Sequence, residues 1–98
     1  MYFITTFTKY EIDRRGFPDI GASRTVGYYS TRDQAFNTVL KNHCDLWETI
    51  YTYAVVEYIE PGLYPIATNR WFFKWNMNTM QYEPTGGLSD NFGNYAFG

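Results

Sequence analysis

Residues 50–59 read Ile-Tyr-Thr-Tyr-Ala-Val-Val-Glu-Tyr-Ile, and this stretch decides the fold class. β-Branched and aromatic residues dominate it, as they do in strands. Alternate residues of a strand point to opposite faces, and both faces here are apolar. A strand that is apolar on both faces is typical of the middle of a covered sheet. One face carries Tyr51, Tyr53, Val55 and Ile59, and the other carries Ile50, Ala54, Val56 and Tyr58.

Four further stretches predict strands around this central one. They are 2–10, 25–29, 70–76 and 80–83. In the first, Phe3, Thr5 and Phe7 share a face by period-two alternation. The third carries Trp71, Phe73 and Trp75 on one side and Phe72, Lys74 and Asn76 on the other. A turn at 76–79 joins the last two strands into a hairpin, since Asn tolerates positive φ.

One helix is predicted between the second and third strands. Thr31 and Gln34 have the spacing of a capping box, in which the hydroxyl accepts a backbone N–H bond. The helix is expected to run to about His43, with one apolar stripe at helical spacing, made by Ala35, Phe36, Val39 and Leu40. Residues 44–48 are compatible with either a further helical turn or a linker.

The order of elements is therefore β-β-α-β-β-β, and the predicted fold class is α+β. The simplest arrangement is an antiparallel sheet with one amphipathic helix packed on one face. We expect a single domain over residues 1–85 and a Gly-rich, aromatic tail over 86–98. Residues 11–24, which contain Gly16, Pro18 and Gly21, predict a long loop that is either functional or a mobile hairpin tip.

Aromatic residues exceed what one small core needs: the chain has 10 Tyr, 8 Phe and 3 Trp in 98 residues. A helix of about 13 residues is roughly 20 Å long and can cover only one face of the sheet. The second face therefore needs the tail, a second copy or a ligand as cover, because large apolar patches on monomers mark interaction sites. We expect a homodimer or a higher homo-oligomer.

Catalytic and metal-binding patterns are missing from the sequence. His43 and Cys44 are the sole residues of their types, too few for a metal site and badly placed for a nucleophilic pair. No nucleotide-loop, hydrolase-elbow or zinc-protease motif occurs. Glu57 lies mid-strand, where an acid–base role is conceivable, but we expect a cross-strand ion pair with Lys74 or Arg70. The sequence predicts no enzyme, no metal and no cofactor; a hydrolase using Glu57 or Asp45 is a weaker alternative.

The net charge of −2 argues against a long nucleic acid as partner, because neutralising many phosphates takes a basic stripe. A small ligand with one to three phosphates needs only two or three arginines. No apolar stretch has the 18 or more residues of a membrane-spanning helix, and no signal peptide is visible. The sequence therefore predicts a cytoplasmic protein.

Arginines and aromatic residues supply the candidate binding site. The arginines would neutralise phosphate, helped by the free N–H groups of the helix N-terminus, and the rings would stack on bases. For the rings, packing in the core is the alternative; for the arginines, it is a solvated surface. The predicted site residues are Arg14, Arg15, Arg24, Tyr28, Arg32, Trp71, Phe73 and Trp75.

Short, acidic, Tyr- and Trp-rich chains with segments such as Tyr53-Ala54-Val55-Val56-Glu57 and Trp71-Phe72-Phe73-Lys74-Trp75 resemble small phage proteins. Within that group the chain is similar in size and composition to the anti-defence sponges that antagonise Thoeris and CBASS immunity. The resemblance implies an oligomeric, non-enzymatic protein that sequesters a small anionic nucleotide signal. The rival hypothesis is a protein–protein inhibitor or adaptor that acts through an exposed aromatic sheet face.

Overall fold

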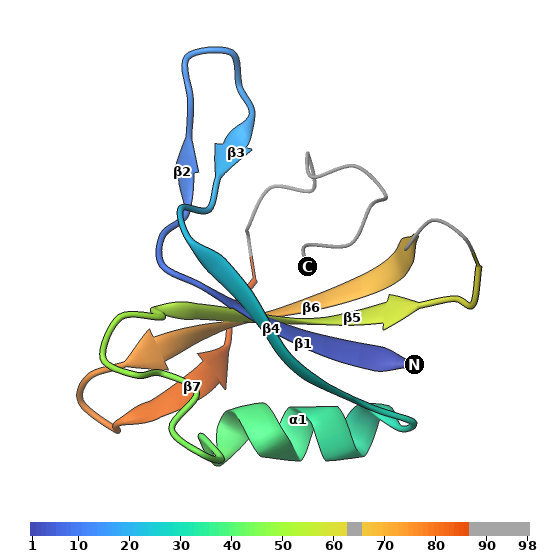
Figure 1. The fold of residues 1–98 in the computed structure, drawn as a ribbon. Helices are drawn as coiled ribbons and strands as arrows, with labels where there is room; N and C mark the ends of the chain where they lie inside the picture. Colours follow the sequence, from blue (N-terminus) through green and yellow to red (C-terminus); the bar gives the residue numbers. More distant parts are fainter. Residues whose placement is uncertain (63–65, 87–98) are drawn as a thin grey trace.

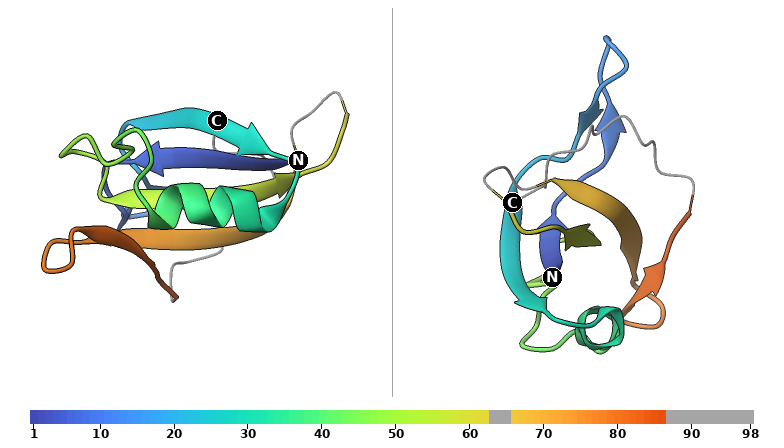
Figure 2. Two further views of the ribbon diagram at one scale, coloured as in Figure 1. Left: turned by 90° about the horizontal axis from the view of Figure 1, so that it is seen from below. Right: turned by 90° about the vertical axis from the view of Figure 1, so that its right-hand side faces the viewer.

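Strand β5 (Tyr53–Ile59) lies in the middle of a five-stranded antiparallel sheet, as its apolar faces predict. The computed structural model describes residues 1–62 and 66–86 (Figure 1). The strand order is β4 (Ser23–Tyr29), β1 (Tyr2–Phe7), β5, β6 (Ala67–Asn76) and β7 (Gln81–Pro84). Helix α1 (Arg32–Leu40) lies along one face of this curved sheet (Figure 2). The predicted α+β fold is confirmed.

The core lies between α1 and the sheet. Ala35 and Val39 of the helix are fully buried against Ile4 of β1 and against Ala54 and Val56 of β5. Trp47, from the segment after the helix, stacks on Trp75 with ring centroids 4.2 Å apart, and Tyr82 meets the same indole edge-on. The Tyr82 hydroxyl donates to the carbonyl of Tyr51, which ties β7 to the start of β5. The predicted helix stripe and the Trp71/Phe73/Trp75 face therefore form one core.

The face of the sheet opposite α1 is also buried at its centre. Phe7 and Val55 are fully buried there, and Phe7 stacks on Tyr53 at 5.2 Å. Thr5 and Glu57 on the same face are almost wholly excluded from solvent. Cover by residues 86–98, one of the three alternatives for this face, falls almost wholly outside the described part of the chain.

Helix α1 and strand β5 are both shorter than predicted. The helix ends at Leu40 rather than near His43, and the strand begins at Tyr53 rather than Ile50. The intervening backbone turns repeatedly through left-handed conformations, with positive φ at Asn42, Cys44, Asp45, Glu48 and Thr49. Asn42 holds this turn together, since its side-chain oxygen accepts from the Trp47 N–H. Such local bonds compete with helix and strand ladders, which is why neither continues. Residues 44–48, for which a further helical turn and a linker were the two alternatives, form a linker made of turns.

The predicted loop over 11–24 is largely a hairpin. Strands β2 (Glu11–Ile12) and β3 (Pro18–Asp19) pair with each other and stand away from the main sheet (Figure 1). Asp13 orders the tip, because its Oδ1 accepts from the N–H groups of Arg15 and Phe17 at 2.8 and 3.0 Å. The segment is thus a hairpin whose tip is held by an Asx turn, in place of the mobile tip that a polar, Gly-containing loop suggests.

The base of this hairpin is held by charge and by close packing. Lys9 Nζ lies 3.1 Å from Asp19 and 3.6 Å from Glu11. The Asp19 carboxylate also accepts from the Gly21 N–H at 3.0 Å. Gly21 has a φ of +68°, and a Cβ there would lie 2.4 Å from the Thr8 hydroxyl, so only glycine fits without a shift. None of the described residues belongs to a helix with the length and hydropathy needed to cross a membrane.

The helix start provides a test of the local structure. Thr31 Oγ1 accepts from the Gln34 N–H at 3.3 Å and donates to the Gln34 side chain at 3.0 Å. Replacing Thr31 by Ala is expected to lower the free energy of unfolding by about 1 kcal/mol, because an orphan N–H loses its acceptor. Thr38→Ala, within the helix, is the control and should stay within about 0.5 kcal/mol of wild type. Urea denaturation measures both; equal losses would contradict the cap.

The hairpin base has an expected pH dependence. The Gly21 N–H bond, followed by Lys9, lowers the pKa of Asp19 below its ordinary value of 3.8. A depressed pKa contributes stability above 3.8 that is lost as the pH falls through the lower, folded value. The chemical shift of the Gly21 amide should therefore titrate with a midpoint below 3.8. Asp19→Asn should abolish this titration, whereas a midpoint at or above 3.8 in wild type would contradict the bond.

Candidate ligand-binding site

One arginine and four aromatic side chains meet at the N-terminal end of α1. The Arg32 guanidinium carbon lies 5.5 Å from the centre of the Phe36 ring and 5.8 Å from that of Trp71. Trp71 meets Phe36 edge-on at 5.7 Å and lies 6.1 Å from Tyr2, which in turn lies 5.0 Å from Tyr58. We call these five residues the Arg–aromatic cluster.

The backbone explains why these residues converge. Arg32 and Phe36 are one helical turn apart, so their side chains share a face of α1. Tyr2 of β1 is the direct cross-strand partner of Tyr58 on β5, and Val56 is that of Trp71 on β6. These strand residues all lie on the face that meets the helix. The cluster is thus the partly exposed end of the core.

Arg32 is exposed to solvent. Its side chain forms no ion pair with any carboxylate in the part of the chain that the structure describes, which agrees with the solvated-surface alternative. Its positive charge lies against the faces of two rings, an arrangement worth about 0.5–1 kcal/mol at an exposed site. The helix N-terminus next to it adds partial positive charge, which Asp33 in the first turn partly offsets.

The other predicted arginines lie elsewhere. Arg14 and Arg15 are at the hairpin tip, where Arg15 pairs with Asp13 at 3.4 Å and lies over the Phe17 ring. Arg24 on β4 pairs with Glu48 at 3.2 Å. Of the four predicted arginines, Arg32 is the one that belongs to the Arg–aromatic cluster.

The predicted stacking residues have three different environments. Phe73 and Trp75 are buried beneath the helix, so the core-packing alternative describes them and neither ring has a face open to a ligand. Tyr28 is 61% exposed and lies 5.3 Å from its cross-strand partner Phe3, on the face of the sheet opposite the cluster. Trp71 alone is half-buried within reach of Arg32.

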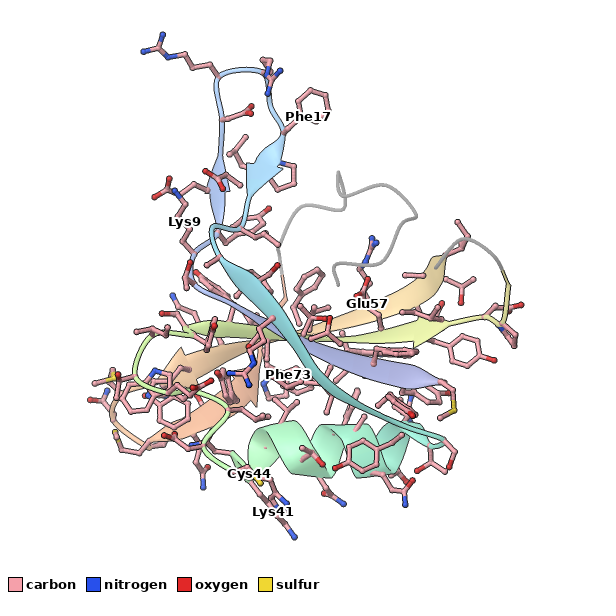
Figure 3. All side chains as sticks on the ribbon, viewed as in Figure 1. Lys9, Phe17, Lys41, Cys44, Glu57 and Phe73 are labelled. Atoms are coloured by element: carbon pink, nitrogen blue, oxygen red, sulfur yellow. The ribbon has the colours of Figure 1, made fainter. Side chains whose placement is uncertain are left out.

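Glu57 forms the cross-strand ion pair that the sequence predicts. Its carboxylate accepts from Arg70 Nε at 2.8 Å, and the two residues are direct partners in the β5–β6 register. Glu57 is wholly buried, whereas 13% of the Arg70 side chain is exposed (Figure 3 labels Glu57). The pair lies on the face opposite the Arg–aromatic cluster. Its chemistry is therefore separate from any ligand held there.

Other reactive groups do not converge. Cys44 is exposed in the turn after α1, and the described residues contain no group of three or more His, Cys, Asp or Glu side chains placed for a metal ion. Burial, with the negative charges of Asp45 and Glu48, raises the pKa of the Tyr82 hydroxyl. Tyr82 is thereby kept as a neutral donor to the Tyr51 carbonyl.

Sequence reasoning missed three members of the cluster. Tyr2 and Tyr58 are 56 positions apart, and only the β1–β5 register makes them neighbours. Phe36 was assigned to the core stripe, and its second role under Arg32 follows from where the helix lies on the sheet. The aromatic surplus was the available signal, but it does not say which rings meet.

The buried ion pair provides a test. Glu57→Gln is expected to lower the free energy of unfolding by about 3–5 kcal/mol, because it leaves the largely buried Arg70 charge without its carboxylate. The double variant Glu57→Leu/Arg70→Leu should recover much of this loss, since neither charge remains. Lys74→Ala, an exposed strand neighbour, is the control and should change stability little. Thermal and urea unfolding compare the four proteins; a double variant no better than Glu57→Gln would contradict this account.

Comparisons with known proteins place no constraint on the cluster. No family model matches the sequence, and no curated protein or solved structure matches it. The chemistry of the cluster therefore follows from the geometry of its own residues.

Proposed function

We propose that the protein binds a small anionic, nucleotide-type ligand at the Arg–aromatic cluster and sequesters it without chemical change. The observation that carries this proposal is the position of Arg32, which lies over two rings and has no carboxylate partner among the described residues. An arginine in this state lacks the counter-charge that would otherwise compete with a phosphate. The half-buried rings beside it provide flat apolar surface for a base.

Charge and stacking would both contribute to the free energy of ligand binding. A phosphate would accept from the Arg32 guanidinium and lie near the N–H groups of the first helical turn. A base would stack on the accessible parts of Tyr2, Tyr58 or Trp71, an interaction worth about 1–3 kcal/mol per base. Asp33 would weaken the site for highly charged ligands, which favours one or two phosphates.

A non-enzymatic role fits the residues that surround this site. The described members of the cluster are one arginine, one phenylalanine, one tryptophan and two tyrosines, which suit holding better than proton transfer at neutral pH. Glu57, the conceivable general base, is paired with Arg70 on the other side of the sheet. Sequestration in a phage–host setting is the context that the resemblance to anti-defence sponges suggests. A homo-oligomer remains part of that proposal.

The rival role, protein binding through an exposed aromatic sheet face, receives less support from the geometry. The residues at the centre of the face away from α1 are buried, including Phe7 and Val55. A partner would have to bind elsewhere on the chain.

Calorimetric titration with cyclic di- and trinucleotides and with ADP-ribose cyclisation products tests the proposal. We expect at least one ligand to bind and to be recovered intact by mass spectrometry. Arg32→Gln should weaken its binding about 10- to 100-fold, since a charge-assisted bond contributes about 1.5–3 kcal/mol. Arg14→Gln removes the same charge at the hairpin tip and is the matched control.

Three results would overturn this function. Absence of binding across the whole panel would exclude small nucleotide-type signals as the ligand. An Arg32→Gln variant that binds as tightly as Arg14→Gln would place the ligand outside the cluster. Recovery of a cleaved ligand would favour an enzyme instead.

A further inference from the structure

The β2–β3 hairpin, with its tip at residues 13–17, forms a projecting arm that does not contribute to the core. Figures 1 and 2 both show it extending away from the sheet. The ion pairs of Lys9 and the Asx turn of Asp13 hold both its ends in one conformation. An arm held rigid in this way loses little conformational entropy when it binds, so preorganisation favours association.

The tip of the arm combines positive charge with apolar surface. Ile12 and Phe17 are 50% and 55% exposed, and the Arg15 side chain is 80% exposed. Arg14 is exposed too, and no described residue forms an ion pair with it. Asp13 accepts three bonds within the tip, one of them from the Arg15 side chain, so Arg14 is the arginine of the tip that no described carboxylate neutralises. Arginine with an aromatic side chain is typical of interface hot spots.

A groove of opposite character lies beside β4. The hollow has a volume of about 260 Å³ and combines two carboxylates, of Asp45 and Glu48, with the apolar side chains of Val26 and Leu46. Arg24 also lines it, so its formal charge is −1. Strand β4 forms one edge of the sheet, and no strand of the described residues pairs with its outer side. The groove therefore fits a positively charged, extended element.

The arm and the groove of one molecule cannot meet. Figure 3 places Phe17 at the tip of the arm and Cys44, which lines the groove, at the opposite end of the molecule. The pairing of β2 with β3 and the ion pairs of Lys9 hold the arm away from the groove. Contact between the two surfaces therefore requires two molecules.

We propose that the arm of one molecule docks in the β4 groove of a second copy of this chain. Arg14 and Arg15 meet Asp45 and Glu48, and Phe17 packs against Val26 and Leu46. The complementarity in charge and in apolar surface selects a second copy over a nucleic acid, because the chain carries a net charge of −2 and the tip displays only two arginines. This association does not depend on the ligand proposed above.

Sedimentation velocity of the full chain, over a range of concentrations, tests the contact through charge reversal. Wild type should self-associate at low salt and dissociate as salt rises from about 0.05 to about 0.5 M. The arm variant Arg14→Glu/Arg15→Glu and the groove variant Asp45→Lys/Glu48→Lys should each lose self-association by at least about tenfold. An equimolar mixture of the two variants should associate again, because each then supplies the opposite charge.

A matched control separates this contact from general charge attraction. Asp33→Lys/Glu60→Lys makes the same change in net charge at two exposed positions outside the groove. Because its arm and groove are both intact, it should self-associate as wild type does. A wild-type chain that stays monomeric throughout, or self-association unchanged in both the arm and groove variants, would overturn the proposal.

A cross-link provides a second measurement that needs no charge reversal. Cys44, the sole cysteine, already lies in the groove. Mixed with wild type under mild oxidation, Arg14→Cys/Cys44→Ala should form an intermolecular disulfide between positions 14 and 44, identified by mass spectrometry. Glu60→Cys/Cys44→Ala is the control and should give little cross-link, because the Cα atoms must approach within about 7 Å. Equal yields from the two would also overturn the proposal.

Discussion

The burial of β5 on both faces is the constraint on which the rest of the structure depends. Ala54, Val55, Val56 and Glu57 are all fully buried, so each neighbouring element is placed by the need to cover them. Helix α1 covers Ala54 and Val56. On the other face Phe7 stacks on Tyr53, and the Glu57 carboxylate pairs with Arg70, which lies directly across the strand pair. A carboxylate at that position without a partner would favour unfolding.

The same constraint creates the cluster that we propose as a binding site. Nine helical residues are too few to cover the full length of the strands, so the core aromatics become accessible at the helix N-terminus. The Arg32 guanidinium lies over two of these rings and not beside a carboxylate of the described residues. The cluster is thus a consequence of a short helix on a wide aromatic sheet, and its capacity for a ligand comes from the rings left partly uncovered.

The segment between α1 and β5 has a second consequence. Its five residues with positive φ end the helix, bring Trp47 onto Trp75 and place Asp45 and Glu48 beside the sheet edge. Packing on one side and an acidic groove on the other thus arise from one set of turns. The arm at the far end of the molecule differs, since Asp13 and Asp19 accept bonds from its own backbone and Arg14 has no ion-pair partner among the described residues.

Local sequence alone determined the strand alternation, the Thr31 cap and the α+β class, because each depends on patterns over a few neighbouring positions. It also indicated a cross-strand ion pair for Glu57, but the β5–β6 register decided that the partner is Arg70 and not Lys74. Tertiary structure decided which distant side chains meet. Tyr2 lies beside Tyr58 because of the β1–β5 register. Arg24 pairs with Glu48 and does not join Arg32 in one phosphate site. Of eight predicted site residues, two belong to the Arg–aromatic cluster, because residue type indicates what a side chain can bind, whereas strand register and helix placement determine its neighbours.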